Sequence, residues 1–187
     1  MDNTTTLPKT TGLKTIDIAY IALGAALITV CSWISIPTAV PFTLQTFAVF
    51  AILSLLGGRR GTLSILVYIL LGAVGAPVFA GFSGGLGVIL GSTGGYIVGF
   101  LLTGLIYWAA EILTKRSLVV EIISLVIGLL ACYALGTVWF MVVYARNAGQ
   151  INLLTALGWC VFPFIIPDLI KLVLGLIIAR RVRPVIR

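Results

Sequence analysis

The chain contains no histidine and few charged residues. Only 9% of its 187 residues are charged and 60% are apolar, whereas an ordinary soluble domain has about 25% charged residues. The lack of histidine excludes a serine–histidine–aspartate triad, a histidine general base and a histidine-ligated metal. The net charge of +7 does not indicate nucleic-acid binding, because the basic residues are sparse and lie at the ends of apolar runs. The composition therefore predicts an integral membrane protein with one domain.

Motifs for metals, nucleotides and proton transport are missing as well. Cys31, Cys132 and Cys160 are isolated in apolar stretches without metal-ligand spacing, so we interpret them as small core or lipid-facing residues. The glycine-rich segment 81–95 lacks the Gly-Lys-Ser/Thr ending of a phosphate-binding loop. The sequence also lacks the intramembrane carboxylates typical of a proton-driven pump. We expect no cofactor, metal or enzymatic activity, and a transport function would take its energy from another polypeptide.

Charged residues divide the chain into long uncharged intervals. The intervals 18–58 and 61–110 contain no charge, and each is long enough for two spans of about 20 residues. The shorter interval 122–145 holds one span. Prolines and glycines near the middle of the long intervals predict the breaks between spans, while strands have no clear signal. We predict an all-α protein with six transmembrane helices near 16–36, 43–57, 62–76, 88–112, 120–144 and 154–180.

The distribution of lysine and arginine predicts the orientation. Residues 1–15 form a short polar segment, and 16–187 form a single six-helix domain. The first apolar run is too long for the core of a signal peptide and no convincing cleavage site follows it, so we expect it to be retained. The positive-inside rule predicts that both termini are cytoplasmic. Ten of the 12 basic residues then lie inside: Lys9, Lys14, Arg59, Arg60, Lys115, Arg116, Arg180, Arg181, Arg183 and Arg187.

An acidic and a basic residue interrupt the last apolar run. Asp168 and Lys171 are three residues apart, so a helix places their side chains on one face within reach of each other. Asp168 precedes Arg180 by 12 residues, or about 18 Å, which predicts a position near the midplane or in the outer half of the bilayer. Either the pair is a closed ion pair that fastens the helix, which its desolvation disfavours, or a bound polar ligand completes its hydrogen bonds.

Two uncharged segments contain further polar candidates. In PTAVPFTLQTF (37–47), Thr43 and Gln45 lie where the second span begins, and Gln45 needs either a ligand or an interhelical hydrogen bond. In PVFAGFSGGLGVILGSTGGY (77–96), successive glycine N–H groups can bind an anion, and the start of the fourth span at Ser92–Tyr96 favours a carboxylate. Alternatively, these glycines permit close helix packing. We expect 37–43 and 77–92 to form an outer lid.

Small residues mark one face of the first span. Ala22 and Ala26, with Gly24 and Ala25 between them, allow close approach of another helix, either internal or from another subunit.

Three motifs together resemble the BioY family, the biotin-specific S subunits of energy-coupling-factor (ECF) transporters. They are PTAVPFTLQTF, the GAPVFAGFSGGLG…GSTGGYIVGF block (75–100) and the late PDLIK, and the resemblance covers most of the chain from about residue 15. It implies a six-helix protein of the plasma membrane that captures vitamin at its outer side. It also implies partners, namely a transmembrane T subunit and two cytoplasmic ABC-type ATPases. Ala22 and Ala26 would contact the T subunit.

The chemistry of biotin assigns roles that follow from this resemblance. Asp168 would accept a hydrogen bond from a ureido N–H, and Lys171 would donate to the ureido oxygen or, alternatively, to the carboxylate of the tail. Because biotin is longer than the reach between these residues, we expect both at the ureido end and the tail at the glycine-rich turn. The expected ligand contacts are Asp168, Lys171, Gln45, Thr43, Phe79, Gly84, Gly85, Ser92, Gly94 and Tyr96.

Three rival functions stay open at this point. The chain can be an S subunit for another vitamin, with the same scaffold and a different ligand. It can be an intramembrane enzyme with Asp168 as general base, although the sequence offers no paired carboxylate or histidine beside it. It can also be a ligand-free channel or scaffold subunit, in which apolar residues can replace Asp168 and Lys171 together.

Overall fold

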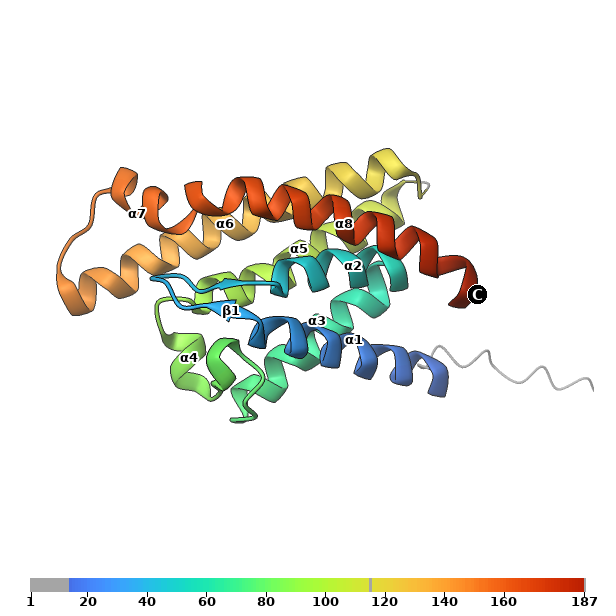
Figure 1. Cartoon of the computed structure of the whole chain (residues 1–187), viewed down its shortest axis with the longest axis horizontal. Coiled ribbons are helices and arrows are strands. Elements are labelled where there is room, and N and C mark those ends of the chain that lie inside the picture. The colour runs from blue at the N-terminus through green and yellow to red at the C-terminus, as the bar shows by residue number, and fades with distance from the viewer. Residues whose placement is uncertain (1–13, 115, 187) are drawn as a thin grey trace, which may run out of the picture.

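The computed structural model describes residues 14–114 and 116–186. The predicted polar segment 1–15 therefore lies almost wholly outside the described residues. The described part is mostly helical (Figure 1). Its elements are α1 (Thr15–Trp33), β1 (Ser35–Ile36), β2 (Phe42–Thr43), α2 (Gln45–Leu56), α3 (Gly58–Ala73), η1 (Ala80–Phe82), α4 (Leu86–Leu90), α5 (Gly94–Leu113), α6 (Leu118–Ala148), α7 (Leu153–Cys160) and α8 (Phe162–Ile186).

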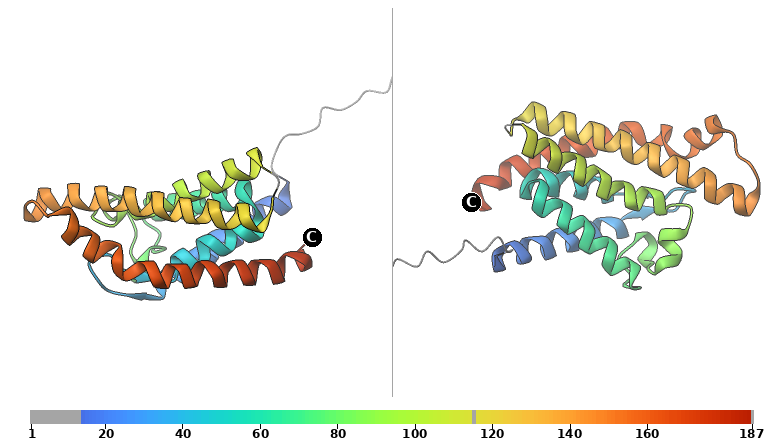
Figure 2. Two further views of the ribbon diagram at one scale, coloured as in Figure 1. Left: turned by 90° about the horizontal axis from the view of Figure 1, so that it is seen from above. Right: turned by 180° about the vertical axis from the view of Figure 1, so that it is seen from behind.

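The longer helices run back and forth between two ends of a bundle. Figures 1 and 2 show α1, α2, α3, α5, α6 and α8 alternating in direction. The start of α1 and the end of α8 lie together at one end, which we call the terminal end. The β1–β2 hairpin, α4 and α7 lie at the opposite end, which we call the loop end.

Four segments are long and apolar enough to cross a membrane. They are Thr15–Trp33, Gly94–Leu113, Leu118–Ala148 and Leu153–Val185, the last of which contains both α7 and α8. Two shorter helices accompany them. α2 is apolar but has only 12 residues, and α3 begins with Gly58, Arg59 and Arg60. The described residues thus form a helical membrane protein with four long apolar segments, and the count of six spans stays a prediction.

Local chemistry explains where the helices differ from the predicted spans. The predicted span 88–112 is divided into α4 and α5, because Gly94 turns so closely against Ile89 that a Cβ would lie 1.6 Å from its carbonyl oxygen. The predicted span 154–180 is divided at Val161. Pro163, which has no N–H to donate, lies in the first turn of α8. The two short strands, for which the sequence has no clear signal, form an antiparallel pair on either side of the proline-rich turn.

Glycines allow α5 and α6 to pack closely. A Cβ on Gly95 would lie 2.3 Å from Trp139 Cβ, and one on Gly99 would lie 3.0 Å from the Cα of Cys132. Thr103 Oγ1 donates to the carbonyl oxygen of Gly128 across the same interface, at 2.9 Å. The expected role of these glycines in helix packing is therefore confirmed for Gly95 and Gly99.

Candidate ligand-binding site

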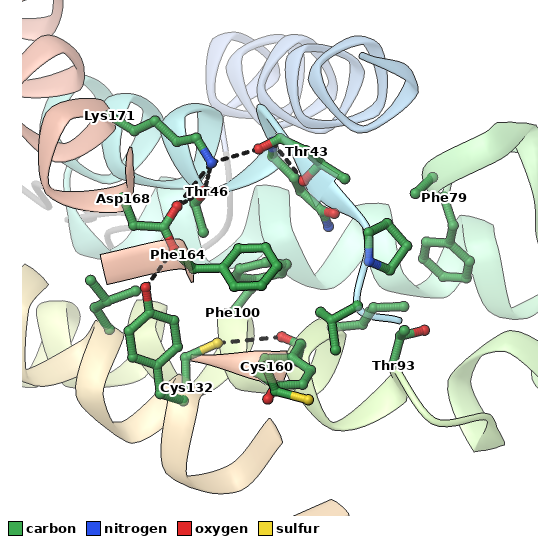
Figure 3. Close-up of a pocket in the computed structure, with 18 of the residues that line it drawn as sticks. Thr43, Thr46, Phe79, Thr93, Phe100, Cys132, Cys160, Phe164, Asp168 and Lys171 are labelled. Atoms are coloured by element: carbon green, nitrogen blue, oxygen red, sulfur yellow. Dashed lines mark hydrogen bonds and ion pairs between the residues drawn. The ribbon is translucent and has the colours of Figure 1, made fainter. Parts of the chain in front are cut away.

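A cavity lies in the half of the bundle nearer the loop end. It is bounded by the starts of α2, α5 and α8, the middle of α6 and the loop before η1, and it has about 740 Å³ of empty space (Figure 3). Its wall is mainly apolar and aromatic, with one buried ion pair. The cavity therefore offers a ligand a few polar groups within a largely apolar wall.

Asp168 is the anionic member of this buried ion pair. Its side chain is buried, with 2% of the residue exposed. Oδ1 accepts hydrogen bonds from Lys171 Nζ and Thr46 Oγ1, both at 2.9 Å (Figure 3). Oδ2 accepts from the hydroxyl of Tyr133 at 2.7 Å. Because a carboxylate has about four acceptor positions, one position on Oδ2 is left for a donor in the cavity.

Lys171 uses all three of its ammonium protons inside the protein. Nζ donates to the carbonyl oxygen of Thr43 at 2.7 Å, to Asp168 Oδ1 at 2.9 Å and to Thr46 Oγ1 at 3.1 Å (Figure 3). It also lies 4.3 Å from the ring centroid of Phe42, a distance at which a cation is attracted to the ring face. The ion pair expected from the spacing is thus closed, and Lys171 must give up one contact before it can donate to a ligand.

Gln45 and Thr43 stand at the start of α2. The Thr43 hydroxyl accepts from the backbone N–H of Gln45 at 3.1 Å, which positions the first residue of the helix. Gln45 Nε2 donates to the hydroxyl of Tyr68 at 2.9 Å, so the expected interhelical hydrogen bond is present. No hydrogen bond from the described residues reaches Gln45 Oε1, which leaves this oxygen as a second acceptor at the cavity wall.

Two aromatic residues expected at the site form part of the wall. Phe79 is buried, packs edge-on against Tyr68 with ring centroids 5.4 Å apart, and fills the space above Gly72. The Tyr96 hydroxyl lies 3.0 Å from Thr137 Oγ1. Both side chains line the cavity, and Phe100 adds a further aromatic wall (Figure 3).

Four other expected contacts do not line the cavity. Gly84, Gly85, Ser92 and Gly94 are absent from its wall. Gly84 backs onto the carbonyl of Ala76, where a Cβ would lie 2.2 Å from the oxygen. Gly85 adopts a left-handed conformation with φ of 96°. These glycines shape the turns around the cavity. In the turn at 92–96, the residues that line the cavity are Thr93, which is labelled in Figure 3, and Tyr96.

The chain resembles known proteins along most of its length. A family profile described as "BioY family" matches residues 3–187. The chain belongs to the BioY family. It is 44% identical over 160 residues to "Biotin transporter BioY" of Thermotoga maritima, covering 84% of this chain and 90% of that protein. It is 42% identical over 172 residues to "Probable biotin transporter BioY" of Pyrococcus horikoshii, covering 91% and 98%.

A solved structure supports the same relationship. The chain matches "the S-component for biotin from an ECF-type ABC transporter" with a TM-score of 0.77 and 27% sequence identity. The match covers 92% of this chain and 95% of that one. This chain therefore shares its fold with that S-component over most of its length.

The expected ligand contacts left out four polar residues of the wall, Ser83, Thr93, Tyr133 and Thr46, and the last two contact Asp168 directly. Both donate to Asp168. Tyr133 offers one signal in the sequence, because a tyrosine hydroxyl in the middle of an apolar span requires a hydrogen-bond partner. Thr46 adjoins Gln45 at the start of the second predicted span. The thiols of Cys132 and Cys160 also line the cavity, in agreement with their interpretation as small buried residues.

The small residues of α1 point in two directions. Gly24 and Ala25 are buried, and a Cβ on Gly24 would lie 2.4 Å from Ser64 Oγ on α3. Ala22 and Ala26 are exposed. The face with Ala22 and Ala26 is thus open to lipid or to another chain. No group of three metal-ligating residues is found in the described part of the chain.

Proposed function

We propose that this chain is the biotin-binding S subunit of an ECF-type uptake transporter. It would capture biotin from outside and deliver it inward together with a T subunit and two ABC-type ATPases. The observation that supports this proposal most is the buried Asp168 carboxylate, which lines a largely apolar cavity and has one acceptor position left. The printed names of the relatives point to the same ligand.

The ureido ring of biotin fits the acceptors of this wall. One ureido N–H would donate to Asp168 Oδ2 and the other to Gln45 Oε1. Tyr133 would hold the carboxylate in place through its own hydrogen bond. Lys171 would reach the ureido oxygen by exchanging one present contact, and its bond to the carbonyl of Thr43 is the one on the loop side. Asp168 and Lys171 would therefore both act at the ureido end.

The rest of biotin would follow the apolar part of the wall. Phe79, Phe100 and Tyr96 line the space next to the polar group and would cover the fused rings. The tail carboxylate would extend towards Thr93, near the start of α5, where backbone N–H groups favour a negative charge.

We propose six passes with both termini in the cytoplasm and the loop end outside. The alternating directions of the helices support six passes (Figure 1). Among the described basic residues, those at the terminal end outnumber those at the loop end, where Arg146 lies near the end of α6, and positive charge marks the cytoplasmic side. The described basic residues of the terminal end are Lys14, Arg59, Arg60, Arg116, Arg180, Arg181 and Arg183.

The loops 37–43 and 77–92 would form the outer lid. Trp33, the last residue of α1, contacts the second of these loops, since its Nε1 donates to the carbonyl of Pro77 at 2.9 Å and its ring stacks on Phe82 with centroids 4.9 Å apart. Ser32 Oγ also donates to the carbonyl of Val78. Spin labels in the two loops should report a distance change on biotin binding, and an unchanged distance would contradict a moving lid.

Titration calorimetry with biotin, thiamin and riboflavin tests the proposed ligand. Any co-purified ligand is first identified by mass spectrometry. One-to-one binding of biotin alone would support the proposal. A folded, ligand-free sample that ignores biotin would overturn it, and binding of thiamin or riboflavin instead would identify an S subunit for another vitamin. Unchanged transport by a double variant, D168L/K171M, would favour a ligand-free scaffold.

Reconstitution with the T subunit and ATPases tests the proposed contact on α1. Ala26→Leu should abolish uptake, because a larger side chain prevents close helix approach, while leaving biotin binding within about twofold. Ala134→Leu, the same substitution at an exposed alanine of α6, is the matched control and should transport normally. Equal uptake by both variants would exclude this face as the T-subunit contact.

A further inference from the structure

A second cavity lies at the terminal end, between the start of α1, the α2–α3 junction and the end of α5. It has about 580 Å³ of empty space and is lined mainly by charged side chains. Three of these are cationic, namely Arg59, Arg60 and Arg116, and two are anionic, namely Asp17 and Glu111. The wall therefore has one excess positive charge, by three minus two. No part of the proposed biotin site lies in this cavity.

The carboxylates of this cavity already have partners. Asp17 is an ion-pair partner of Arg60 at 2.5 Å and accepts from the backbone N–H of Lys14 at 3.0 Å. Glu111 accepts from the backbone N–H of Gly58 at 2.6 Å. The anionic groups thus hold the start of α3 and its neighbours in place and are not free to bind a cation.

One cation of the wall, Arg59, has no ion-pair partner among the described residues. Arg60 is paired with Asp17, and Arg116 is shared between Glu111 at 3.3 Å and another carboxylate. Within the described residues, Arg59 lines the cavity without a hydrogen bond or ion pair and acts on Asp17 through a longer-range attraction. An unpaired guanidinium beside two paired ones attracts an anion, and its planar donors match phosphate oxygens.

Apolar side chains next to the cavity indicate which kind of anion would bind there. Ile112 and Leu113 directly follow Glu111 and are 71% and 81% exposed. Ile16 and Ile18 flank Asp17 and are also more than half exposed. In a membrane protein such side chains contact acyl chains. A cationic cavity bordered by them lies where phospholipid headgroups meet the hydrocarbon region.

We infer that this cavity binds the phosphodiester group of an anionic phospholipid. Arg59 donates to the free phosphate oxygens, with Arg60 and Arg116 bordering the same space. The single excess charge of the wall matches the single negative charge of a phosphatidylglycerol headgroup. A zwitterionic lipid would bring an additional ammonium group next to unpaired Arg59. The bound lipid would connect the start of α1 to α3 and α5 independently of biotin.

Native mass spectrometry of the detergent-purified full chain tests this inference. The protein is equilibrated with phosphatidylglycerol, phosphatidylethanolamine or phosphatidylcholine of identical acyl chains. Phosphatidylglycerol should be retained several-fold better than the other two. Arg59→Gln should reduce its retention about tenfold, the loss expected for a charge-assisted contact. Arg181→Gln is the matched control, because Arg181 is an exposed arginine at the same end, without a hydrogen bond or ion pair to the described residues.

Several outcomes would overturn the inference. Equal retention of the three lipids would exclude a headgroup site, and equal losses in the two variants would indicate diffuse attraction to the whole terminal end. Displacement of the lipid by glycerol phosphate at equal concentration would identify a site for free phosphate. A defect of Arg59→Gln in binding the T subunit or the ATPases, without a change in lipid retention, would identify a protein contact. Biotin calorimetry shows whether each variant is folded.

Discussion

Each end of the bundle buries a carboxylate that is part of an ion pair, and the two sites differ in the amount of empty space beside that carboxylate. Asp168, towards the loop end, and Glu121, near the terminal end, are each 2% exposed. Glu121 Oε1 accepts from Arg116 at 2.8 Å and from Arg183 at 2.9 Å. The empty space beside Glu121 is about 170 Å³, against about 740 Å³ beside Asp168.

The two carboxylates also differ in the hydrogen-bond donors that surround them. Around Glu121 the arginines also bind backbone, since Arg116 and Arg183 both donate to the carbonyl oxygen of Ser54. This cluster joins α2, α6 and α8. Around Asp168 the donors are hydroxyls and one ammonium, and an acceptor position faces the cavity. Buried charge alone therefore does not identify a ligand site, whereas buried charge beside unfilled space does.

The largest effect should come from removing the charge at the terminal end. Glu121→Gln leaves Arg116 and Arg183 without their shared anion, and breaking a buried ion pair in this way typically costs about 3–5 kcal/mol of stability. Thermal unfolding in detergent should show this loss. Biotin affinity of the folded fraction should change less than about twofold, because the site is remote. A variant that keeps its stability but loses biotin affinity would contradict the assignment of stability to the terminal end and of ligand binding to the loop end.

Asp168→Asn should lower biotin affinity, and because it also leaves the buried Lys171 without its anion it should cost stability as well. It removes a charged acceptor of the ureido N–H, worth about 1.5–3 kcal/mol, so biotin should bind about 10- to 150-fold more weakly. Titration calorimetry measures the affinity, and size-exclusion chromatography verifies the fold. Unchanged affinity would show that Asp168 does not contact the ligand and would return the ion pair to a purely structural role.

Tyr133→Phe should produce a smaller loss at the loop end. It removes the 2.7 Å hydrogen bond to Asp168 but keeps the charge and the ring. We expect about tenfold weaker biotin binding, because a hydrogen bond to a charged group is worth about 1.5 kcal/mol or more. Affinity equal to the wild type would mean that Thr46 and Lys171 suffice to orient the carboxylate.

Much of the fold was predictable because the bilayer excludes charge. The uncharged intervals predicted each long helix approximately, and the spacing of Asp168 and Lys171 predicted their contact, since positions i and i+3 meet on any helix. A helix start near Ser92–Tyr96 was predicted and agrees with the start of α5, whereas the separate helix α4 was not predictable, because the break between α4 and α5 depends on a backbone contact between Gly94 and Ile89. A hydropathy pattern contains no information of that kind.

The partners of the site were less predictable than its charges. Tyr133 is 35 residues from Asp168 in the chain, and their contact depends on how α6 is rotated against α8. The glycines illustrate the same limit. Gly84 and Gly99 occur in the same glycine-rich region, yet one permits a tight turn and the other permits helix packing. Sequence spacing alone allows both roles, and the tertiary structure decides between them.

The smallest expected effect contrasts Tyr133 with a second buried tyrosine. Tyr107 lies by the small space next to Glu121, and its hydroxyl has no hydrogen-bond partner within the described residues. An unpaired buried hydroxyl costs free energy, so Tyr107→Phe should leave stability unchanged or raise it by up to about 1 kcal/mol. Thermal unfolding measures the difference. A loss of stability would mean that the hydroxyl has a partner, either Arg116 or an ordered water, in which case the terminal end is a connected polar network and its contrast with the loop end is one of size alone.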